Sequence, residues 1–144
     1  MLDYEKETEI APPSSPLTVK INMTFLDLIF DSWAKKYLPA YEVVKTSGYR
    51  TKEKNAEVGG AANSAHVHGL AYDFVLKQGG KLITGEKFKS IYKEFIEPNW
   101  PGFALFEGDH VHVNLSRKIT VYAGLIGLSA IGAIVAKVFY KGRE

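Results

Sequence analysis

The sequence predicts an α+β fold, a small antiparallel sheet with flanking helices, followed by one C-terminal transmembrane helix. Three observations lead to this expectation: apolar residues recur at helical spacing in residues 24–39 and 88–96, short strand-like segments alternate with turn residues, and residues 119–136 carry no charge. A chain of 144 residues has room for one domain, and because its last quarter differs from the rest, the domain itself has about 100 residues.

The first twenty residues are predicted to form a flexible tail. They carry several acidic side chains and then the run Ala-Pro-Pro-Ser-Ser-Pro at residues 11–16, in which the prolines remove backbone donors and disfavour a helix. No apolar run follows a basic start, so we expect no N-terminal signal peptide. The predicted organisation is a tail at 1–20, a domain at 21–117, a transmembrane helix at 118–141 and a short tail at 142–144.

Two segments are predicted to be amphipathic helices. In the first, from Thr24 to Pro39, apolar residues fall at near-helical spacing: Phe25, Leu28, Ile29 and Trp33. In the second, which Pro98 ends, they repeat at i, i+3, i+4, i+7 and i+8: Phe88, Ile91, Tyr92, Phe95 and Ile96. Each helix therefore has one apolar face that a sheet could cover.

Four segments are predicted to be strands, at residues 41–46, 70–76, 103–106 and 111–115. A long polar loop that begins at Ser47 separates the first two, residues 77–85 form a turn region, and Glu107-Gly108-Asp109 separates the last two. Helices beside a small sheet give the α+β class.

The C-terminal run is predicted to span a membrane. Its 18 uncharged residues, 119–136, would measure roughly 27 Å as a helix, close to the hydrocarbon thickness of about 30 Å, and the span extends to Tyr140 if Lys137 snorkels. Membrane lipid is then a partner, and small residues such as Gly124 and Gly132 suit helix–helix self-association. The alternative is a buried C-terminal core helix.

Composition excludes two classes of site. The chain has no cysteine, which rules out a disulfide scaffold and a thiolate metal site. Lys plus Arg exceed Asp plus Glu by only two, and no basic cluster stands out, so we expect no nucleic-acid partner.

The four histidines lie in two pairs near carboxylates, and each pair is beside a predicted strand: His66 with His68, and His110 with His112. Imidazole nitrogen and carboxylate oxygen are the usual ligands of a catalytic zinc ion, which takes three protein ligands and leaves the fourth position to water. Because alternate residues of a strand share a face, a site made of all four histidines is an alternative.

Three segments then show a resemblance: Ser-Gly-Tyr-Arg at 47–50, Ser-Ala-His-Val-His-Gly-Leu-Ala-Tyr-Asp at 64–73, and Asp-His-Val-His-Val at 109–113. Over about residues 46–115 the chain resembles the zinc D-alanyl-D-alanine carboxypeptidases and phage L-alanyl-D-glutamate endopeptidases, which have the hedgehog/DD-peptidase fold. Their Ser-x-His-x-x-Gly-x-Ala-x-Asp signature implies His66 and Asp73 as Zn²⁺ ligands. Their Asp/Glu-x-x-His element implies His112 as the third ligand and Asp109 as general base.

The carboxylate that acts as base depends on local geometry. Residues i and i+3 of a regular strand face opposite ways, so Asp109 can serve the same centre as His112 only if residues 108–110 form a turn or bulge, which Gly108 permits. Glu107 is a second carboxylate close enough in sequence to compete.

Two further polar residues are substrate-binding candidates. Arg50 could hold a peptide carboxylate or the oxyanion of the reaction through paired hydrogen bonds, which makes it a catalytic candidate too, and its alternative is a surface arginine. Ser64, whose counterpart in the family contacts substrate, could equally bond its own backbone. Tyr49 and Trp100 are expected in the core rather than under a substrate.

The resemblance implies a zinc-dependent peptidase that cuts a peptide bond in peptidoglycan stem peptides, either as a D,D-carboxypeptidase or as an L,D-endopeptidase. The alternatives are a non-catalytic cell-wall-binding or structural virion module on the same fold, and a metal-binding domain with no peptidase role. With the predicted anchor and no signal peptide, we expect a membrane-anchored protein that acts on the cell wall. It would reside in a bacteriophage virion membrane, or serve at lysis, or reside in a bacterial inner membrane.

Overall fold

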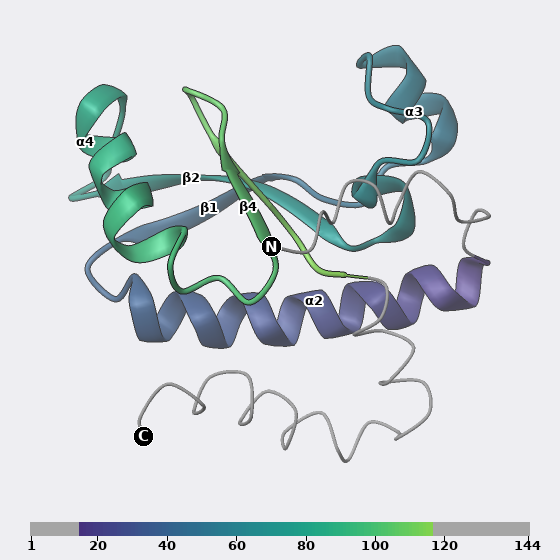
Figure 1. Cartoon of the computed structure of the whole chain (residues 1–144), viewed down its shortest axis with the longest axis horizontal. Coiled ribbons are helices and arrows are strands. Elements are labelled where there is room, and N and C mark those ends of the chain that lie inside the picture. The colour runs from purple at the N-terminus through teal and green to yellow at the C-terminus, as the bar shows by residue number, and fades with distance from the viewer. Residues whose placement is uncertain (1–14, 117–144) are drawn as a thin grey trace.

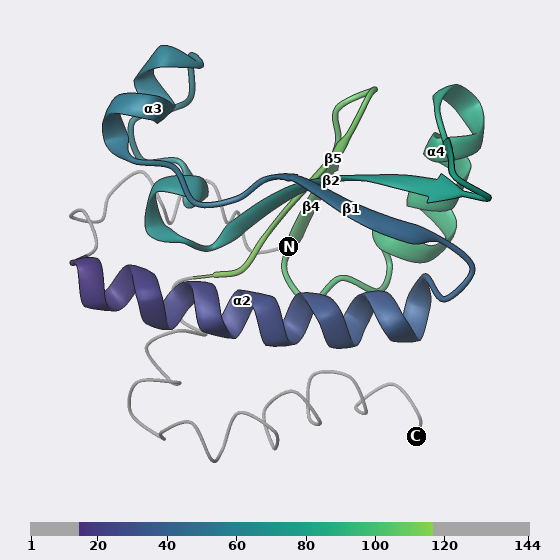
Figure 2. The same ribbon diagram turned by 180° about the vertical axis from the view of Figure 1, so that it is seen from behind.

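A long helix, α2 (Pro16–Tyr37), lies along a five-stranded antiparallel sheet in the computed structural model, which describes residues 15–116 (Figures 1 and 2). The strands are β1 (Glu42–Ser47), β2 (Ala71–Gln78), β3 (Lys81–Leu82), β4 (Phe103–Phe106) and β5 (Val111–Asn114). Their order is β1-β2-β5-β4, and the short β3 pairs with β2. The predicted α+β architecture with four main strands is confirmed.

Helix α2 begins at Pro16, whereas we predicted a start at Thr24 and assigned residues 16–20 to a flexible tail. The oxygen of Ser15 caps the helix by accepting a hydrogen bond from the Thr18 amide at 3.2 Å. Proline at the first helical position costs no hydrogen bond and already has the helical φ. The Pro/Ser run therefore starts this helix.

The segment between β1 and β2, predicted to be a loop, contains two short helical elements. They are α3 (Lys52–Glu57), which Thr51 caps, and the 3₁₀ helix η1 (Ala65–His68), which Ser64 caps. Both are too short to show an apolar period, so polar caps define them. They lie at one end of the sheet, and α4 (Gly85–Ile91) lies at the other (Figures 1 and 2).

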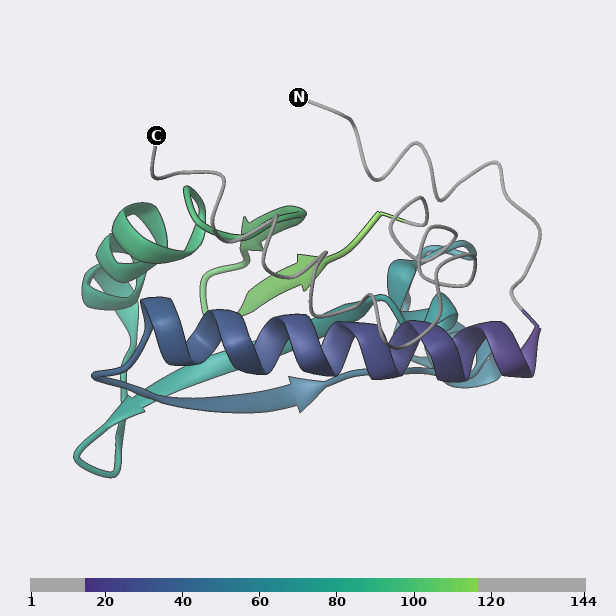
Figure 3. The same cartoon turned by 90° about the horizontal axis from the view of Figure 1, so that it is seen from below.

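The predicted second helix is confirmed as α4 continued by a π-helical turn, η2 (Tyr92–Ile96). Its inward side chains are buried and belong to the core: Phe88, Ile91, Tyr92 and Ile96. The view from below shows α4 beside the end of α2 that leads into β1 (Figure 3).

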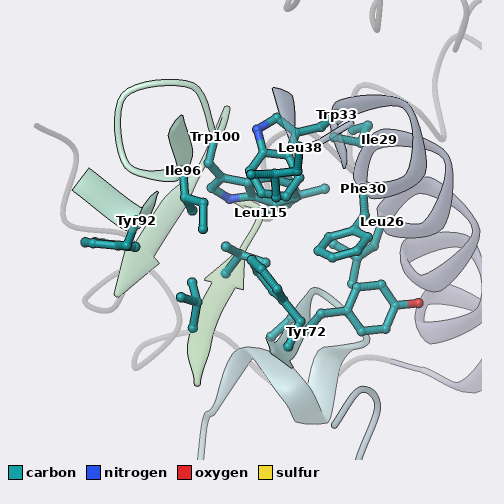
Figure 4. Packing of buried hydrophobic residues seen from close by; sticks show 14 of the residues in the cluster. Leu26, Ile29, Phe30, Trp33, Leu38, Tyr72, Tyr92, Ile96, Trp100 and Leu115 are labelled. Atoms are coloured by element: carbon teal, nitrogen blue, oxygen red, sulfur yellow. The ribbon is translucent and has the colours of Figure 1, made fainter. Parts of the chain in front are cut away.

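Aromatic rings fill the space between α2 and the sheet (Figure 4). Trp33 packs edge-on against Trp100, with ring centroids 5.0 Å apart, and Phe30 contacts Phe74 at 5.3 Å. Burying each such side chain stabilises the fold by about 1.5–3 kcal/mol. Trp100 is thus a core residue as predicted, but Tyr49 is 45% exposed, so the expectation that it lies in the core is wrong.

The predicted fold class is wrong in its last component. No helix in residues 15–116 is both long enough and apolar enough to cross a membrane. Helix α2 has 22 residues, but it is amphipathic and buries one face against the sheet. The segments assigned to a transmembrane helix, 118–141, and to a short tail, 142–144, lie outside the described residues.

Candidate metal centre

Three side chains from three different elements point their ligand atoms at one another. Oδ1 of Asp73, on β2, lies 3.2 Å from Nε2 of His66 on η1 and 3.0 Å from Nδ1 of His112 on β5. The two imidazole nitrogens are 3.2 Å apart. These are the three residues that the sequence predicted as zinc ligands, and the structure brings them together.

The sheet register accounts for two of the three positions. Asp73 and His112 are directly opposite each other in the antiparallel pair of β2 and β5, so their side chains leave the same face of the sheet. On the other side, β1 has an irregularity between Lys45 and Ser47 that sets Ser47 opposite Asp73.

A tight turn after η1 connects it to β2 and holds His66 close to Asp73. Gly69 ends η1 in the left-handed conformation, with φ of 72°, and the amide of Leu70 then donates to the carbonyl of Ala65 at 3.0 Å. A side chain at position 69 would lie 2.9 Å from the carbonyl oxygen of Val19 on α2. Both facts explain why the signature requires glycine here.

The centre is buried, and its carboxylate is ionised. Asp73 is 7% exposed and His66 is 3% exposed. Burial raises the pKa of Asp73, but the hydrogen bonds and charges of His112 and His66 outweigh burial and hold this pKa well below its usual range. An ionised carboxylate beside two imidazoles is a donor set that attracts a divalent cation.

The outer nitrogens of both rings have partners. Nδ1 of His66 donates to the carbonyl oxygen of Gly48 at 2.8 Å, so a neutral His66 ring would bind a metal through the lone pair of Nε2, the nitrogen that faces the centre. His112 is turned the other way, with Nδ1 facing the centre and Nε2 lying 3.2 Å from the side-chain amide of Asn114. Such outer contacts orient metal-binding histidines in proteins.

Arg50 lies against the carboxylate. Its Nη2 donates to Oδ2 of Asp73 at 3.0 Å, and its Nε and Nη2 donate to Oγ of Ser47 at 3.0 and 2.9 Å. Arg50 also lines the cavity beside the centre, and its contact with a substrate carboxylate or oxyanion stays a prediction.

A cavity of about 440 Å³ opens on the three ligands. One wall comes from the segment between α3 and η1, including Val58, Ala61 and Ser64, and the other from the turn between β4 and β5, with Glu107 and His110. A volume of roughly 300–1,000 Å³ is typical of ligand sites. Ser64 lines this cavity and accepts a hydrogen bond from the His66 amide at 3.3 Å, so it does bond the nearby backbone, and its contact with substrate stays a prediction.

The turn after β4 holds two carboxylates on either side of His110. Nδ1 of this ring is 2.6 Å from Asp109 and Nε2 is 2.8 Å from Glu107. Gly108 has φ of 93°, so the residues between the two strands do form the expected turn. Glu107 lines the cavity, whereas the side chain of Asp109 is 89% exposed and is not part of the lining.

The four-histidine alternative is not the arrangement that the structure has. Among residues 15–116, the group whose ligand atoms lie close enough to hold a metal is His66, Asp73 and His112. His110 is engaged with the two carboxylates of the turn. His68 is buried on η1, where Nδ2 of Asn22 donates to its carbonyl oxygen.

The donor set fits zinc. Ligand atoms at about 2.0–2.2 Å from a tetrahedral ion lie about 3.3–3.6 Å from one another, close to the spacings found among the three side chains. Two imidazoles and one carboxylate with an open side toward a cavity correspond to a catalytic zinc site, which keeps one position for water.

A family model described as Peptidase M15 matches residues 14–114, a range that includes all three ligands. This chain belongs to the peptidase M15 family. M15 members are zinc peptidases, which agrees with the donor set of the centre. No curated protein and no solved structure shows a significant match to the chain.

The sequence alone predicts no role for three residues that contact the metal ligands or Arg50: Ser47, Gly48 and Asn114. Ser47 and Gly48 belong to the Ser-Gly-Tyr-Arg segment, but their contacts with Arg50 and His66 depend on the irregularity in β1. Asn114 follows His112 by two residues on a strand, and that spacing alone could have identified it as a neighbour on the same face.

Proposed function

We propose that this M15 domain is a zinc-dependent peptidase that hydrolyses a peptide bond in the stem peptides of bacterial peptidoglycan. The observation that carries the proposal is the convergence of His66, Asp73 and His112 at the floor of an open cavity. Bound there, zinc would lower the pKa of a coordinated water toward about 7 and polarise a carbonyl group.

The cavity supports a short, polar peptide as substrate. Its lining combines the cationic Arg50 with Ser64, Asn63 and small apolar residues. A guanidinium suits the free carboxylates of a stem peptide, and it would also suit the oxyanion that forms during hydrolysis. We propose that Arg50, which is 20% exposed, exchanges part of its contact with Asp73 for a contact with the substrate.

Proton transfer is assigned to Asp109, as its position three residues before His112 implies. Its carboxylate is tethered to His110 on an exposed turn, and rotation about its side-chain bonds can replace that contact. Glu107 is the alternative base that the structure supports, because it lines the cavity. Either carboxylate would accept a proton from the attacking water and return it to the leaving amine.

The experiment uses the full chain with zinc and isolated peptidoglycan, and mass spectrometry identifies the fragments released. Loss of terminal D-alanine would identify a D,D-carboxypeptidase, and new termini at L-alanine would identify an L,D-endopeptidase. His66→Ala, which removes a ligand, should release no fragments. If the wild-type protein with zinc bound releases none either, the proposal is wrong, and cosedimentation with the walls would then favour a binding module.

A further inference from the structure

Asn114 is the donor in its hydrogen bond with His112, and a metal bound to His112 must reverse the roles of donor and acceptor. Nδ1 of His112 is the atom that faces the other two ligands, at 3.0 Å from Oδ1 of Asp73 and 3.2 Å from Nε2 of His66. In the arrangement seen, Nδ1 donates to Asp73, and Nε2 accepts a hydrogen bond from Nδ2 of Asn114 at 3.2 Å. This assigns the ring proton to Nδ1.

A metal on Nδ1 takes the position of that proton. A neutral imidazole that binds a metal through one nitrogen carries its proton on the other, so Nε2 of His112 becomes a donor. The amide Nδ2 is a donor as well, and two donors would then face each other over the same distance.

The side chain of Asn114 holds the group that resolves this conflict. Its Oδ1 is buried and has no hydrogen-bond partner among the described residues. A half-turn about the Cβ–Cγ bond exchanges Oδ1 and Nδ2 and places the acceptor against Nε2. Buried acceptors without partners are uncommon in proteins, so this one requires an explanation.

The rest of Asn114 is held in place, so this exchange is local. The residue is 4% exposed and pairs with Ala71 of β2 and Phe103 of β4. Its backbone carbonyl accepts a hydrogen bond from Nε1 of Trp100 at 2.9 Å, and a side chain at Gly102 would clash with this carbonyl. Only the amide group is left to turn.

We propose that Asn114 is a positioning residue for the metal: in the zinc-bound protein its Oδ1 accepts a hydrogen bond from Nε2 of His112, which fixes Nδ1 as the ligand atom. The inference rests on the proposed zinc site but not on the substrate or the reaction. Asn114 is the counterpart, for His112, of the Gly48 carbonyl that fixes the other imidazole.

The first test measures zinc affinity by competition with a chromophoric chelator. Asn114→Leu keeps the volume of the side chain and removes the acceptor, and its zinc affinity should fall by about 10–100-fold. Asn114→Asp keeps an acceptor at the same place and should bind zinc at least as tightly as the wild type. Asn99→Ala is the control: it removes an amide that donates to the carbonyl oxygen of Phe95, outside the lining of the cavity, and it should leave zinc affinity unchanged.

A second measurement separates positioning from a loss of structure. The unfolding of each metal-free variant shows whether Asn114→Leu folds as well as the wild type, and loss of zinc affinity in a folded variant supports the proposal. Histidine ¹⁵N spectra of the zinc-loaded wild type should show the His112 proton on Nε2 and the metal on Nδ1. Because this readout needs no variant, a His112 proton found on Nδ1 would overturn the proposal even if Asn114→Leu fails to fold.

Two outcomes would overturn the inference while leaving the proposed function intact. One is a wild type that binds zinc together with a folded Asn114→Leu protein of equal affinity. The other is a zinc-loaded spectrum in which the His112 proton is on Nδ1. A wild-type protein that binds no zinc would instead reject the metal centre itself, and with it the proposed function.

Discussion

Arg50 donates a hydrogen bond from Nη2 to Oδ2 of Asp73 over 3.0 Å, while Oδ1 of the same carboxylate faces the two histidines. The guanidinium therefore fixes which carboxylate oxygen is available to a metal. Ser47 in turn fixes the guanidinium by accepting from its Nε and Nη2. A residue expected at the substrate thus also belongs to the support of the metal centre.

Replacing Arg50 should weaken both zinc binding and catalysis. Arg50→Ala leaves Oδ2 of Asp73 without its cationic partner, and we expect zinc affinity to fall by about 10–100-fold, measured by chelator competition. Ser47→Ala is the matched control, because it keeps the contact between Arg50 and Asp73, and its effect should be smaller. Unchanged zinc affinity in Arg50→Ala together with a large loss of kcat would mean that Arg50 acts on the substrate alone.

The two carboxylates of the β4–β5 turn should differ in their effect on turnover. If Asp109 is the general base, Asp109→Asn should lower kcat by about 10²–10⁴-fold with zinc affinity unchanged, whereas Glu107→Gln should have a much smaller effect. Steady-state release of the cleavage product measures both. The opposite ranking would assign the base to Glu107, the carboxylate that lines the cavity.

Gly69→Ala should destabilise the fold and disturb the position of His66. The substitution combines a positive φ with a contact of 2.9 Å to the backbone of α2, and we expect a loss of about 2–3 kcal/mol in the free energy of unfolding. Gly59→Ala is the control, because Gly59 has φ of 75° with nothing near its Cβ position, so it should cost only about 1 kcal/mol. Chemical denaturation gives both values, and equal losses would show that the contact with α2 is relieved at little cost.

The sequence predicted what is encoded locally. The strands and the helix at 88–96 follow from apolar periodicity, and the three ligands lie in short segments whose residue spacing carries the resemblance. The start of α2 is not evident from the sequence, because a Pro/Ser run usually disfavours a helix, whereas here Ser15 and Pro16 form the cap and the first turn.

What the sequence could not predict depends on contacts between distant segments. The irregularity in β1 sets Ser47 opposite Asp73, and only the folded sheet shows that Arg50 reaches the carboxylate. The exposure of Asp109 depends on the direction in which a four-residue turn projects its side chains, which spacing along the chain does not determine. The prediction of a transmembrane helix rests on the hydropathy of residues 119–136 alone, and hydropathy reports composition without the surrounding fold.

Tyr72 should make the stability of the domain sensitive to alkaline pH. Its hydroxyl donates to Asp27 on α2, and burial, this hydrogen bond and the charges of Asp27 and Asp31 raise the pKa of Tyr72 well above its ordinary value of 10.0. A raised pKa means that the folded state favours the neutral phenol. Its contribution is therefore complete below pH 10 and is lost as the pH rises from there toward the pKa of the folded state.

Tyr72→Phe tests this linkage, because it keeps the ring that packs against Phe30 and removes the ionisable group. At about pH 8 the variant should be less stable than the wild type by about 1 kcal/mol, the size of one hydrogen bond to a charged group that is partly solvated. As the pH rises above about 10, the stability of the wild type should fall toward that of the variant, because unfolding then releases a proton from Tyr72. Urea denaturation of both proteins across this range measures the gap, and a gap that stays constant with pH would mean that Tyr72 titrates in the folded protein as it does in the unfolded chain.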